Sequence, residues 1–206
     1  MTTISIIGSG KMSGAIATVA TRAGAAIQII KRSVASTTEA HPGLEYGIMG
    51  DELTGDLVVL AVPYGAYPSI LEHYRDQLSE KVVIDISNPI DFSTYDELTS
   101  PADSSTAAEL TKLLPEGAAV VKAFNVNLGD TLTSGTNGTT RTTVLYAGDY
   151  ADAKMTVAAL IEAAGMRAVD VGPLTRAREL EAMGFLQIIM AALGKTHYES
   201  GFTLLP

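Results

Sequence analysis

The chain has 206 residues, with 23 Asp and Glu residues against 14 Lys and Arg residues, and it contains no cysteine. The net charge of −9 and the lack of a dense basic run argue against nucleic acid or an anionic membrane as partner. The missing cysteines exclude disulfides, thiolate catalysis and thiolate metal sites.

The N-terminal segment has the pattern of a dinucleotide-binding unit. Residues Thr3 to Ile7 are mostly apolar and β-branched, which predicts a buried strand, and Gly8–Gly10 predict a tight turn. An amphipathic helix is expected from Lys11 to about Arg22. In such a unit a pyrophosphate rests on the unpaired N–H groups of the helix N-terminus. Ser13 replaces the third glycine of the GxGxxG pattern, and it is small enough to keep the packing close.

The second predicted strand, Ile27 to Ile30, ends in residues that select the nucleotide. An acidic residue at this place binds the 2′-hydroxyl of NAD. Here Lys31 and Arg32 follow instead, with the hydroxyls of Ser33 and Ser36 nearby. Two cations suit the dianionic 2′-phosphate of NADP, whereas the alternative is an ordinary solvated charge pair at a strand end. The sequence therefore predicts NADP(H) as the cofactor.

Strands and helices alternate through the rest of the chain. Apolar runs predict strands at Leu44–Ile48, Asp56–Pro63, Lys81–Ile90, Ala118–Asn125, Thr142–Ala147 and Arg167–Val171. Periodicity predicts helices at Tyr64–Leu78, Thr106–Leu114, Tyr150–Ala164 and Leu174–Leu193, the second opened by a capping box of Thr106 and Glu109. The polar stretches 91–105 and 127–141 are expected to be loops, the first a lid, a binding loop or a disordered surface loop.

This order predicts the α/β class: a Rossmann-type, doubly wound and mostly parallel sheet in a single domain over residues 1–206. A strand–helix extension is expected from about residue 142. The last helix is apolar almost all round towards its end, so we expect it to pack on the sheet or on a second subunit. Its apolar stretch, Ala182 to Leu193, is too short to span a bilayer, and no signal peptide is apparent. We expect a cytoplasmic protein.

The reactive end of the site is expected where parallel strands end. Ala61–Pro63 would border the cofactor crevice, and Lys122 and Asn125 emerge at the end of another strand. No metal-ligand spacing, no GxSxG motif and no strong general acid–base group is present in the sequence. Hydride exchange between two redox cofactors needs mainly ring alignment and exclusion of water, so the sequence favours that chemistry. A tyrosine or Lys122 remains the alternative proton donor.

The chain resembles a known family, the NADP oxidoreductases that depend on the deazaflavin coenzyme F420. The segments that carry the resemblance occur in this order: IGSGKMSGAIA, KRS, DLVVLAVP, VVIDISNP, SSTAAELTKLLP, VVKAFN, YAGD and VDVGPLTRARELEAM. The same domain resembles the cytosolic part of the Steap metalloreductases. Its first half is also similar to the pyrroline-carboxylate reductases.

The resemblance implies an NADP(H) site, a deazaflavin stacked on the nicotinamide, and a homodimer. The positions that it implies are Gly8, Ser9, Gly10, Lys11 and Met12 for the pyrophosphate; Lys31, Arg32 and Ser33 for the 2′-phosphate; Ala61, Val62, Pro63, Asn88 and Pro89 for the ribose and ring; and Ala123 with Asn125 for the carboxamide end. The chain departs from the family at Ser13 and at Val126, where many relatives have threonine near the presumed acceptor pocket.

We therefore expect an NADP(H)-dependent oxidoreductase that transfers a hydride between the nicotinamide C4 and a deazaflavin (F420)-like partner. One alternative is an NADPH-dependent reductase of a small imine, a flavin or a specialised metabolite. The other is a non-catalytic NADPH-binding sensor.

Overall fold

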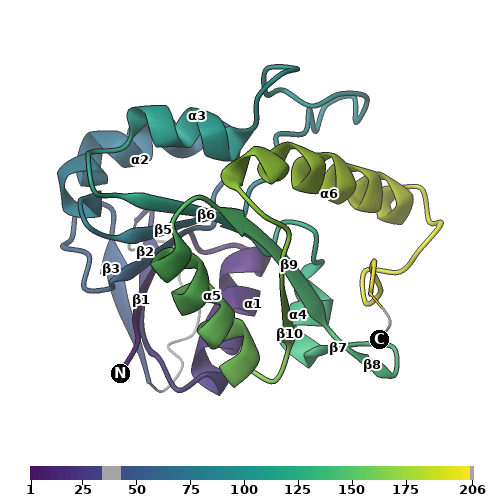
Figure 1. The fold of residues 1–206 in the computed structure, drawn as a ribbon, viewed down its shortest axis with the longest axis horizontal. Helices are drawn as coiled ribbons and strands as arrows, with labels where there is room; N and C mark the ends of the chain where they lie inside the picture. The colour runs from purple at the N-terminus through teal and green to yellow at the C-terminus, as the bar shows by residue number, and fades with distance from the viewer. Residues whose placement is uncertain (34–42, 205–206) are drawn as a thin grey trace.

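The computed structural model describes residues 1–33 and 43–204 and is built around an eight-stranded sheet (Figure 1). The strand order is β10-β9-β6-β5-β4-β1-β2-β3. Its strands are β1 (Thr3–Ile7), β2 (Ala26–Lys31), β3 (Leu44–Ile48), β4 (Leu57–Leu60), β5 (Val82–Asp85), β6 (Ala119–Ala123), β9 (Thr143–Gly148) and β10 (Arg167–Asp170). A separate ribbon pairs β7 (Thr136–Asn137) with β8 (Thr140–Arg141).

The six strands from β3 to β6 are parallel to one another, and β9 joins β6 in the antiparallel direction. The last strand, β10, runs parallel to β9. The strand β4 is apolar and buried along its whole length, as expected of a strand covered on both faces. The prediction of a mostly parallel sheet is therefore confirmed.

Helices cover both faces of the sheet, which confirms the doubly wound arrangement. In Figure 1, α1 and α5 lie on one face with α4 beside α1, and α2, α3 and α6 lie on the other. The helices are α1 (Lys11–Arg22), α2 (Tyr67–Tyr74), α3 (Thr106–Leu113), α4 (Gly129–Ser134), α5 (Ala151–Ala163) and α6 (Ala177–Ala192), with 3₁₀ turns η1 (Tyr64–Ala66), η2 (Arg75–Leu78) and η3 (Leu174–Arg176). Each face has its own apolar core.

The stretch 127–141 is not the irregular loop that its polar composition predicts. It contains α4, β7 and β8. Hydroxyl groups of this short helix bond its own backbone, as when Thr133 Oγ1 donates to the Gly129 carbonyl at 2.9 Å. The Arg22 guanidinium of α1 donates to the carbonyls of Leu132 and Thr133 near the helix end. Side-chain bonds and a distant arginine therefore stabilise a helix that has no apolar periodicity.

The capping box expected at Thr106 and Glu109 is also wrong by one residue. Ser105 is the N-cap, and its hydroxyl accepts a hydrogen bond of 3.1 Å from the Ala108 amide. Glu109 pairs with Lys112 and accepts a hydrogen bond from the hydroxyl of Ser104, the residue before the cap. Thr106 is therefore the first helical residue, and its side chain is free to enter a buried polar cluster.

Several predicted elements are shorter than expected, among them the strands predicted over 56–63 and 118–125, which are β4 and β6. The helix predicted over 64–78 is α2 flanked by the turns η1 and η2. The strand predicted over 81–90 is reduced to β5 and an isolated bridge between Ile90 and Leu98. Helix α6 packs on α3, η3 and β9, which confirms a C-terminal helix packed on the sheet. Within residues 1–33 and 43–204, no helix combines the length and the apolarity that a bilayer crossing requires.

Candidate functional site

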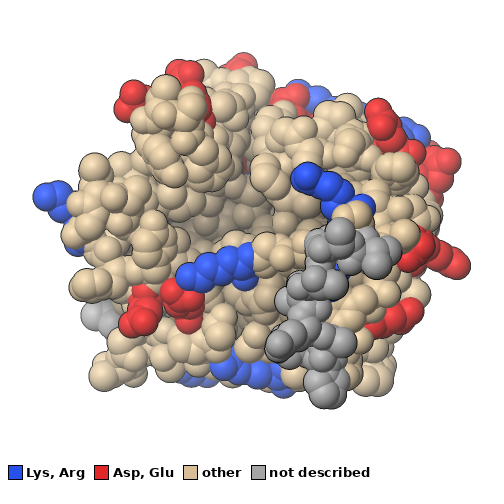
Figure 2. All heavy atoms as spheres, turned by 180° about the vertical axis from the view of Figure 1, so that it is seen from behind, with Lys and Arg blue, Asp and Glu red and all other residues tan. Residues whose placement is uncertain are grey.

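Two adjoining pockets open where β1, β2 and β4 end. Pocket A has a volume of about 590 Å³ and is lined by Ile7, Gly8, Ser9, Gly10, Ile30, Arg32, Ser33, Met49, Ala61, Val62, Pro63, Ala66, Ser69 and Ile70. Pocket B has a volume of about 330 Å³ and is lined by Gly10, Lys11, Met12, Ala61, Val62, Pro63, Ile86, Ser87, Asn88, Phe92 and Ile188. Four residues are common to both, so an elongated ligand can run from one pocket into the other. Figure 2 shows a hollow in the middle of one face, with Lys or Arg side chains beside it.

The turn after β1 brings two glycines to this place for different reasons. Gly8 has a φ of 128°, and a Cβ atom there would lie 2.2 Å from the Ala61 carbonyl oxygen. Only glycine allows β1 and β4 to end so close together. Gly10 has a φ of −87° and no heavy atom within 4 Å of a Cβ position. It caps α1 without a side-chain hydrogen bond, so the helix presents its first N–H groups to the two pockets.

Ser13 has a defined task at the position of the missing third glycine. Its side chain is buried, and its hydroxyl donates a hydrogen bond of 2.7 Å to the Gly8 carbonyl. The bond ties the first turn of α1 to the glycine turn. Gly14, one place later, is exposed and has open space around it. Serine is therefore compatible with the GxGxxG pattern, and its hydrogen bond also stabilises the glycine turn.

Replacing Ser13 with alanine is expected to lower the free energy of unfolding by about 1 kcal/mol, the value of one neutral hydrogen bond. The matched control is Thr18→Ala, because the Thr18 hydroxyl bonds the Gly14 carbonyl on the outer side of the same helix, at 3.0 Å. Urea denaturation of both variants measures the difference. Equal losses of unfolding free energy would show that the bond from Ser13 to Gly8 stabilises the fold no more than the exposed bond from Thr18 does.

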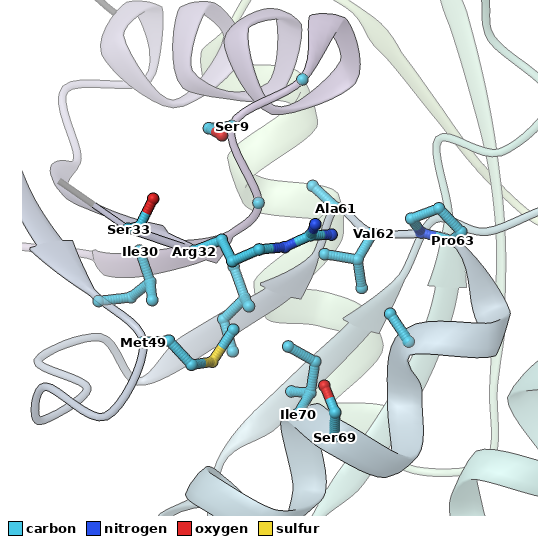
Figure 3. A pocket seen from close by; sticks show the side chains of 14 residues that line it. Ser9, Ile30, Arg32, Ser33, Met49, Ala61, Val62, Pro63, Ser69 and Ile70 are labelled. Carbon is cyan, nitrogen blue, oxygen red and sulfur yellow. The ribbon is translucent and has the colours of Figure 1, made fainter. Parts of the chain in front are cut away.

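The two cations at the end of β2, Lys31 and Arg32, point to different places. In Figure 3 the Arg32 side chain extends across pocket A towards Ala61, and no ion pair between described residues involves it. Lys31 is only 8% exposed, and its ammonium lies 4.1 Å from the centroid of the Tyr46 ring. Of the predicted pair, Arg32 lines the pocket together with Ser33, and Lys31 does not. Ser36 lies outside the described residues.

Pocket B is walled mostly by apolar side chains. Met12 of α1, Ile86 after β5 and Ile188 of α6 line it. Phe92 comes from the irregular stretch 91–105, so this stretch contributes to the wall of pocket B. Lys11 lies at its edge, paired with Asp130 at 2.9 Å and largely exposed. The described lining contains no carboxyl group, histidine or tyrosine.

Asn88 of pocket B is held by hydrogen bonds at both polar atoms of its side-chain amide. Its Nδ2 donates to the Asn125 carbonyl at 2.8 Å, and Asn125 Nδ2 donates back to Asn88 Oδ1 at 2.8 Å. A buried Phe124 with a φ of 64° turns the backbone between β6 and Asn125. Gly184 lets α6 approach, since a Cβ there would lie 2.4 Å from Asn88 Oδ1.

Besides Lys31, three predicted site residues do not line the pockets. Pro89, Ala123 and Asn125 are buried and do not belong to either lining, although Asn125 orients Asn88 directly. Val126 is buried away from pocket B as well, so the departure from the family pattern does not touch that pocket. The residues that sequence reasoning missed are Ile7, Ile30, Met49, Ala66, Ser69, Ile70, Ile86, Ser87, Phe92 and Ile188.

Lys122 does not reach the pockets, contrary to its expected place at the reactive end. It is fully buried in a polar cluster, where its ammonium lies 3.0 Å from Asp85 Oδ2 and 2.9 Å from Glu181 Oε1. It also donates to the Ser87 carbonyl at 2.6 Å and to Thr106 Oγ1 at 3.0 Å. The cluster joins β5, β6, α3 and α6. Lys122 therefore links the strands and helices behind pocket B.

Two titrating groups of this cluster are shifted. Burial alone would raise the pKa of Asp85, but the Lys122 ammonium and hydrogen bonds from Tyr67 and Ser87 outweigh it and hold that pKa below its usual value. Burial, followed by the charge of Asp85, raises the pKa of Tyr67 well above its usual value. Near neutral pH the cluster therefore contains an ionised carboxylate and a protonated phenol.

Comparison with known proteins gives a family match in the N-terminal part of the chain. The family described as NADP oxidoreductase, coenzyme F420-dependent, matches residues 3–89, which include the glycine turn, Arg32 and Asn88. Metalloreductase STEAP3 of Rattus norvegicus is 31% identical over 181 residues, covering 87% of this chain and 36% of the relative. An F420-dependent NADP reductase of Methanocaldococcus jannaschii is 30% identical over 150 residues, covering 68% of this chain and 66% of the relative.

The chain thus spans between about a third and two thirds of the length of these curated relatives. Among solved structures, a protein of Arthrobacter sp. FB24 named as a candidate F420-dependent NADP reductase superposes with a TM-score of 0.87. It covers 100% of both chains at 24% sequence identity, which supports the fold.

Proposed function

Because the chain belongs to the family of coenzyme F420-dependent NADP oxidoreductases, we propose that it transfers a hydride between NADP(H) and a planar deazaflavin-like partner. The observation that carries this proposal is the pair of pockets joined at Gly10 and Ala61–Pro63. Pocket A offers an arginine and a hydroxyl to an anion, and pocket B offers an apolar slot. A dinucleotide lying across the shared wall would bring its nicotinamide into pocket B.

In this arrangement, each end of the nucleotide is held by residues with suitable chemistry. The helix start after Gly8–Gly10 would hold the pyrophosphate on its unpaired N–H groups. Arg32 and Ser33 would bind the 2′-phosphate, and Met49 and Ile70 line the same pocket with apolar surface for the adenine. Asn88, held by its amide pair with Asn125, would offer its polar group near the nicotinamide ribose.

The chemistry proposed for pocket B is hydride transfer without a protein acid. One hydride, which carries two electrons, passes between the nicotinamide C4 and a ring carbon of the acceptor, and any further proton exchanges with solvent. Met12, Ile86, Phe92 and Ile188 would align the two rings and exclude water, which is what such a transfer requires. The burial of Lys122 among Asp85, Glu181 and Thr106 removes the lysine donor from the imine-reductase alternative.

The deciding experiment measures NADPH oxidation with a panel of acceptors that contains coenzyme F420, FMN and small cyclic imines. Saturable turnover with F420 alone supports the proposal. Turnover restricted to FMN or the imines selects the reductase alternative. Tight NADPH binding without turnover by any acceptor selects the sensor.

Replacing Arg32 with alanine is expected to weaken NADPH binding by about 2–3 kcal/mol and to leave NADH binding nearly unchanged, because one charge-assisted contact to the 2′-phosphate is lost. The matched control is Lys31→Met, since Lys31 stacks on Tyr46 and does not line pocket A. Calorimetric titration with both nucleotides measures the difference. A larger loss in the Lys31 variant, or equal losses for NADPH and NADH, refutes the assignment.

We also propose that residues 1–206 form a single domain that works as a homodimer in the cytoplasm. Helix α6 supports a second subunit, because Leu186 is 52% exposed and Leu193 is 66% exposed along it or at its end. The lack of cysteine is compatible with a reducing compartment.

A further inference from the structure

The described lining of pocket B contains one aromatic side chain, that of Phe92, and the described lining of pocket A contains none. Phe92 is 56% exposed, so a large part of its surface remains available to a ligand. Ile188 of α6 lines the same pocket, and in Figure 1 the stretch between β5 and α3, which contains Phe92, loops out near α6. A planar ligand in pocket B can therefore lie against an aromatic ring that no other described residue of the two pockets supplies.

The chain around Phe92 is folded on itself and holds this residue in place. The amide and the hydroxyl of Thr99 both donate to the Pro89 carbonyl, which closes the stretch into a loop. Within the loop, the amide and the hydroxyl of Ser93 both donate to Asp91 Oδ1, at 2.8 and 2.6 Å. These last two bonds join the residues directly before and after Phe92, so the backbone that carries its ring is fixed on both sides.

Tyr95 restricts the orientation of the Phe92 ring. The two ring centroids lie 5.8 Å apart and the ring planes are at 90°, which is an edge-to-face contact. Tyr95 has a φ of 60°, a left-handed conformation that bulky residues rarely adopt, and its amide donates to the Asp91 carbonyl at 2.7 Å. Such backbone strain persists only where the surrounding structure holds it, and it is frequent at ligand-binding positions. Here it brings a second ring against Phe92.

We propose that Phe92 selects the acceptor of pocket B by stacking on a fused aromatic ring, and that Tyr95 is the positioning residue for Phe92. The role of Phe92 rests on the proposed function, because it names the feature of the acceptor that pocket B recognises. Met12, Ile86 and Ile188 are not aromatic and contact apolar ligands of any shape. An aromatic side chain adds a contribution that depends on the π-system of the ligand. A small non-aromatic imine lacks that system, so Phe92 favours an isoalloxazine or deazaflavin ring over it.

The test uses lumiflavin, an isoalloxazine ring without a tail, and follows its fluorescence anisotropy as the full chain saturated with NADP+ is added. A saturable rise is expected for the wild type. Phe92→Leu keeps an apolar side chain and removes the ring, and it is expected to raise the Kd for lumiflavin about 3- to 10-fold. Phe92→Tyr keeps the ring and is expected to bind lumiflavin within about twofold of the wild type.

Two controls separate this effect from a general loss of structure. The Kd for NADP+, measured by calorimetry, is expected to change less than about twofold in Phe92→Leu, since Phe92 does not line pocket A. Tyr150→Leu is the matched control for an exposed ring, because Tyr150 is 58% exposed and lines neither pocket. It is expected to leave the Kd for lumiflavin unchanged.

The positioning role of Tyr95 is tested by a double variant. Tyr95→Leu is expected to raise the Kd for lumiflavin about 2- to 5-fold, and Tyr95→Phe is expected to leave it unchanged, because the edge-to-face contact remains. When Phe92→Leu and Tyr95→Leu are combined, the Kd is expected to equal that of Phe92→Leu alone, because Tyr95 acts through the Phe92 ring. Additive losses would overturn the role of Tyr95.

Equal lumiflavin affinities of the wild type and Phe92→Leu would overturn the role of Phe92, as would a failure of Phe92→Tyr to preserve binding. A wild type that gives no saturable rise in anisotropy would also overturn it. Lumiflavin binding that depends on Phe92, without NADPH turnover by any acceptor, would refute the proposed hydride transfer and leave the role of Phe92 intact. Turnover of F420 with the same KM in the wild type and Phe92→Leu would do the reverse.

Discussion

Replacing Lys122 with methionine is expected to lower the free energy of unfolding by about 3–5 kcal/mol at pH 8. The substitution leaves the carboxylates of Asp85 and Glu181 buried without their cation, at 0% and 1% side-chain exposure. It also removes the donor to the Ser87 carbonyl, next to Asn88 in pocket B. Urea denaturation of the purified variant measures the loss.

The pH dependence of this variant is expected to be opposite in sign to that of the wild type. In the wild type the pKa of Asp85 is lowered, so its contribution is present above about pH 4 and is lost as the pH falls through the folded value. Without Lys122, burial raises the pKa of the Asp85 carboxyl, so the folded variant takes up a proton as the pH falls. The free energy of unfolding of the variant therefore rises from pH 8 to pH 5. Over this range, the difference in free energy of unfolding between the wild type and the variant becomes smaller.

The matched control is Lys112→Met, because Lys112 forms an exposed ion pair with Glu109 at 2.7 Å. It is expected to cost less than about 1 kcal/mol and to leave the pH dependence unchanged. Parallel curves for the wild type and the Lys122 variant between pH 8 and pH 5 would contradict the role of the ammonium in holding the two carboxylates.

Replacing Gly8 with alanine is expected to cost about 3 kcal/mol or more of folding stability, because two penalties coincide. The φ of 128° disfavours any L side chain, and the new Cβ would lie 2.2 Å from the Ala61 carbonyl oxygen. Because that contact is with backbone, β1 and β4 would have to move apart at the mouth of the pockets. Thermal unfolding followed by circular dichroism measures the loss.

Gly10→Ala is the matched control from the same turn. Gly10 has a φ of −87° and open space around it, so alanine is expected to cost about 1 kcal/mol or less, the scale of a weakened N-cap. Since Gly10 lines both pockets, the proposed function predicts weaker NADPH binding by this folded variant. Similar unfolding temperatures for the two variants would contradict the close approach at Gly8.

Local patterns were enough to predict the elements whose signals are adjacent in the chain. The strand Thr3–Ile7 and the helix Lys11–Arg22 occur as predicted, because strand, glycine turn and helix follow one another without a gap. The turn predicted at Gly8–Gly10 lies at the pockets for the same reason. The sheet order around β1 also follows from the alternation of strands and helices.

Features that depend on distant partners could not be predicted in this way. Lys122 stands at the end of a strand, as ligand-binding residues do, but its partner Glu181 comes from the last helix. Helix α4 accepts hydrogen bonds from Arg22 of α1. Its own sequence has no apolar periodicity from which the helix could be predicted. Phe92 and Ile188 of pocket B come from an irregular stretch and from a helix with apolar residues on several sides.

The residues shared by pockets A and B, Gly10 and Ala61–Pro63, separate two groups of positions that can be redesigned independently. Met49 and Ser69 belong to pocket A alone, whereas Phe92 and Ile188 belong to pocket B alone. Under the proposed function, nucleotide preference and acceptor range would therefore be two separate engineering problems, each with its own set of editable positions. Substitutions at Gly10 or Ala61–Pro63 would alter both properties at once, which makes these positions the least suitable place to begin.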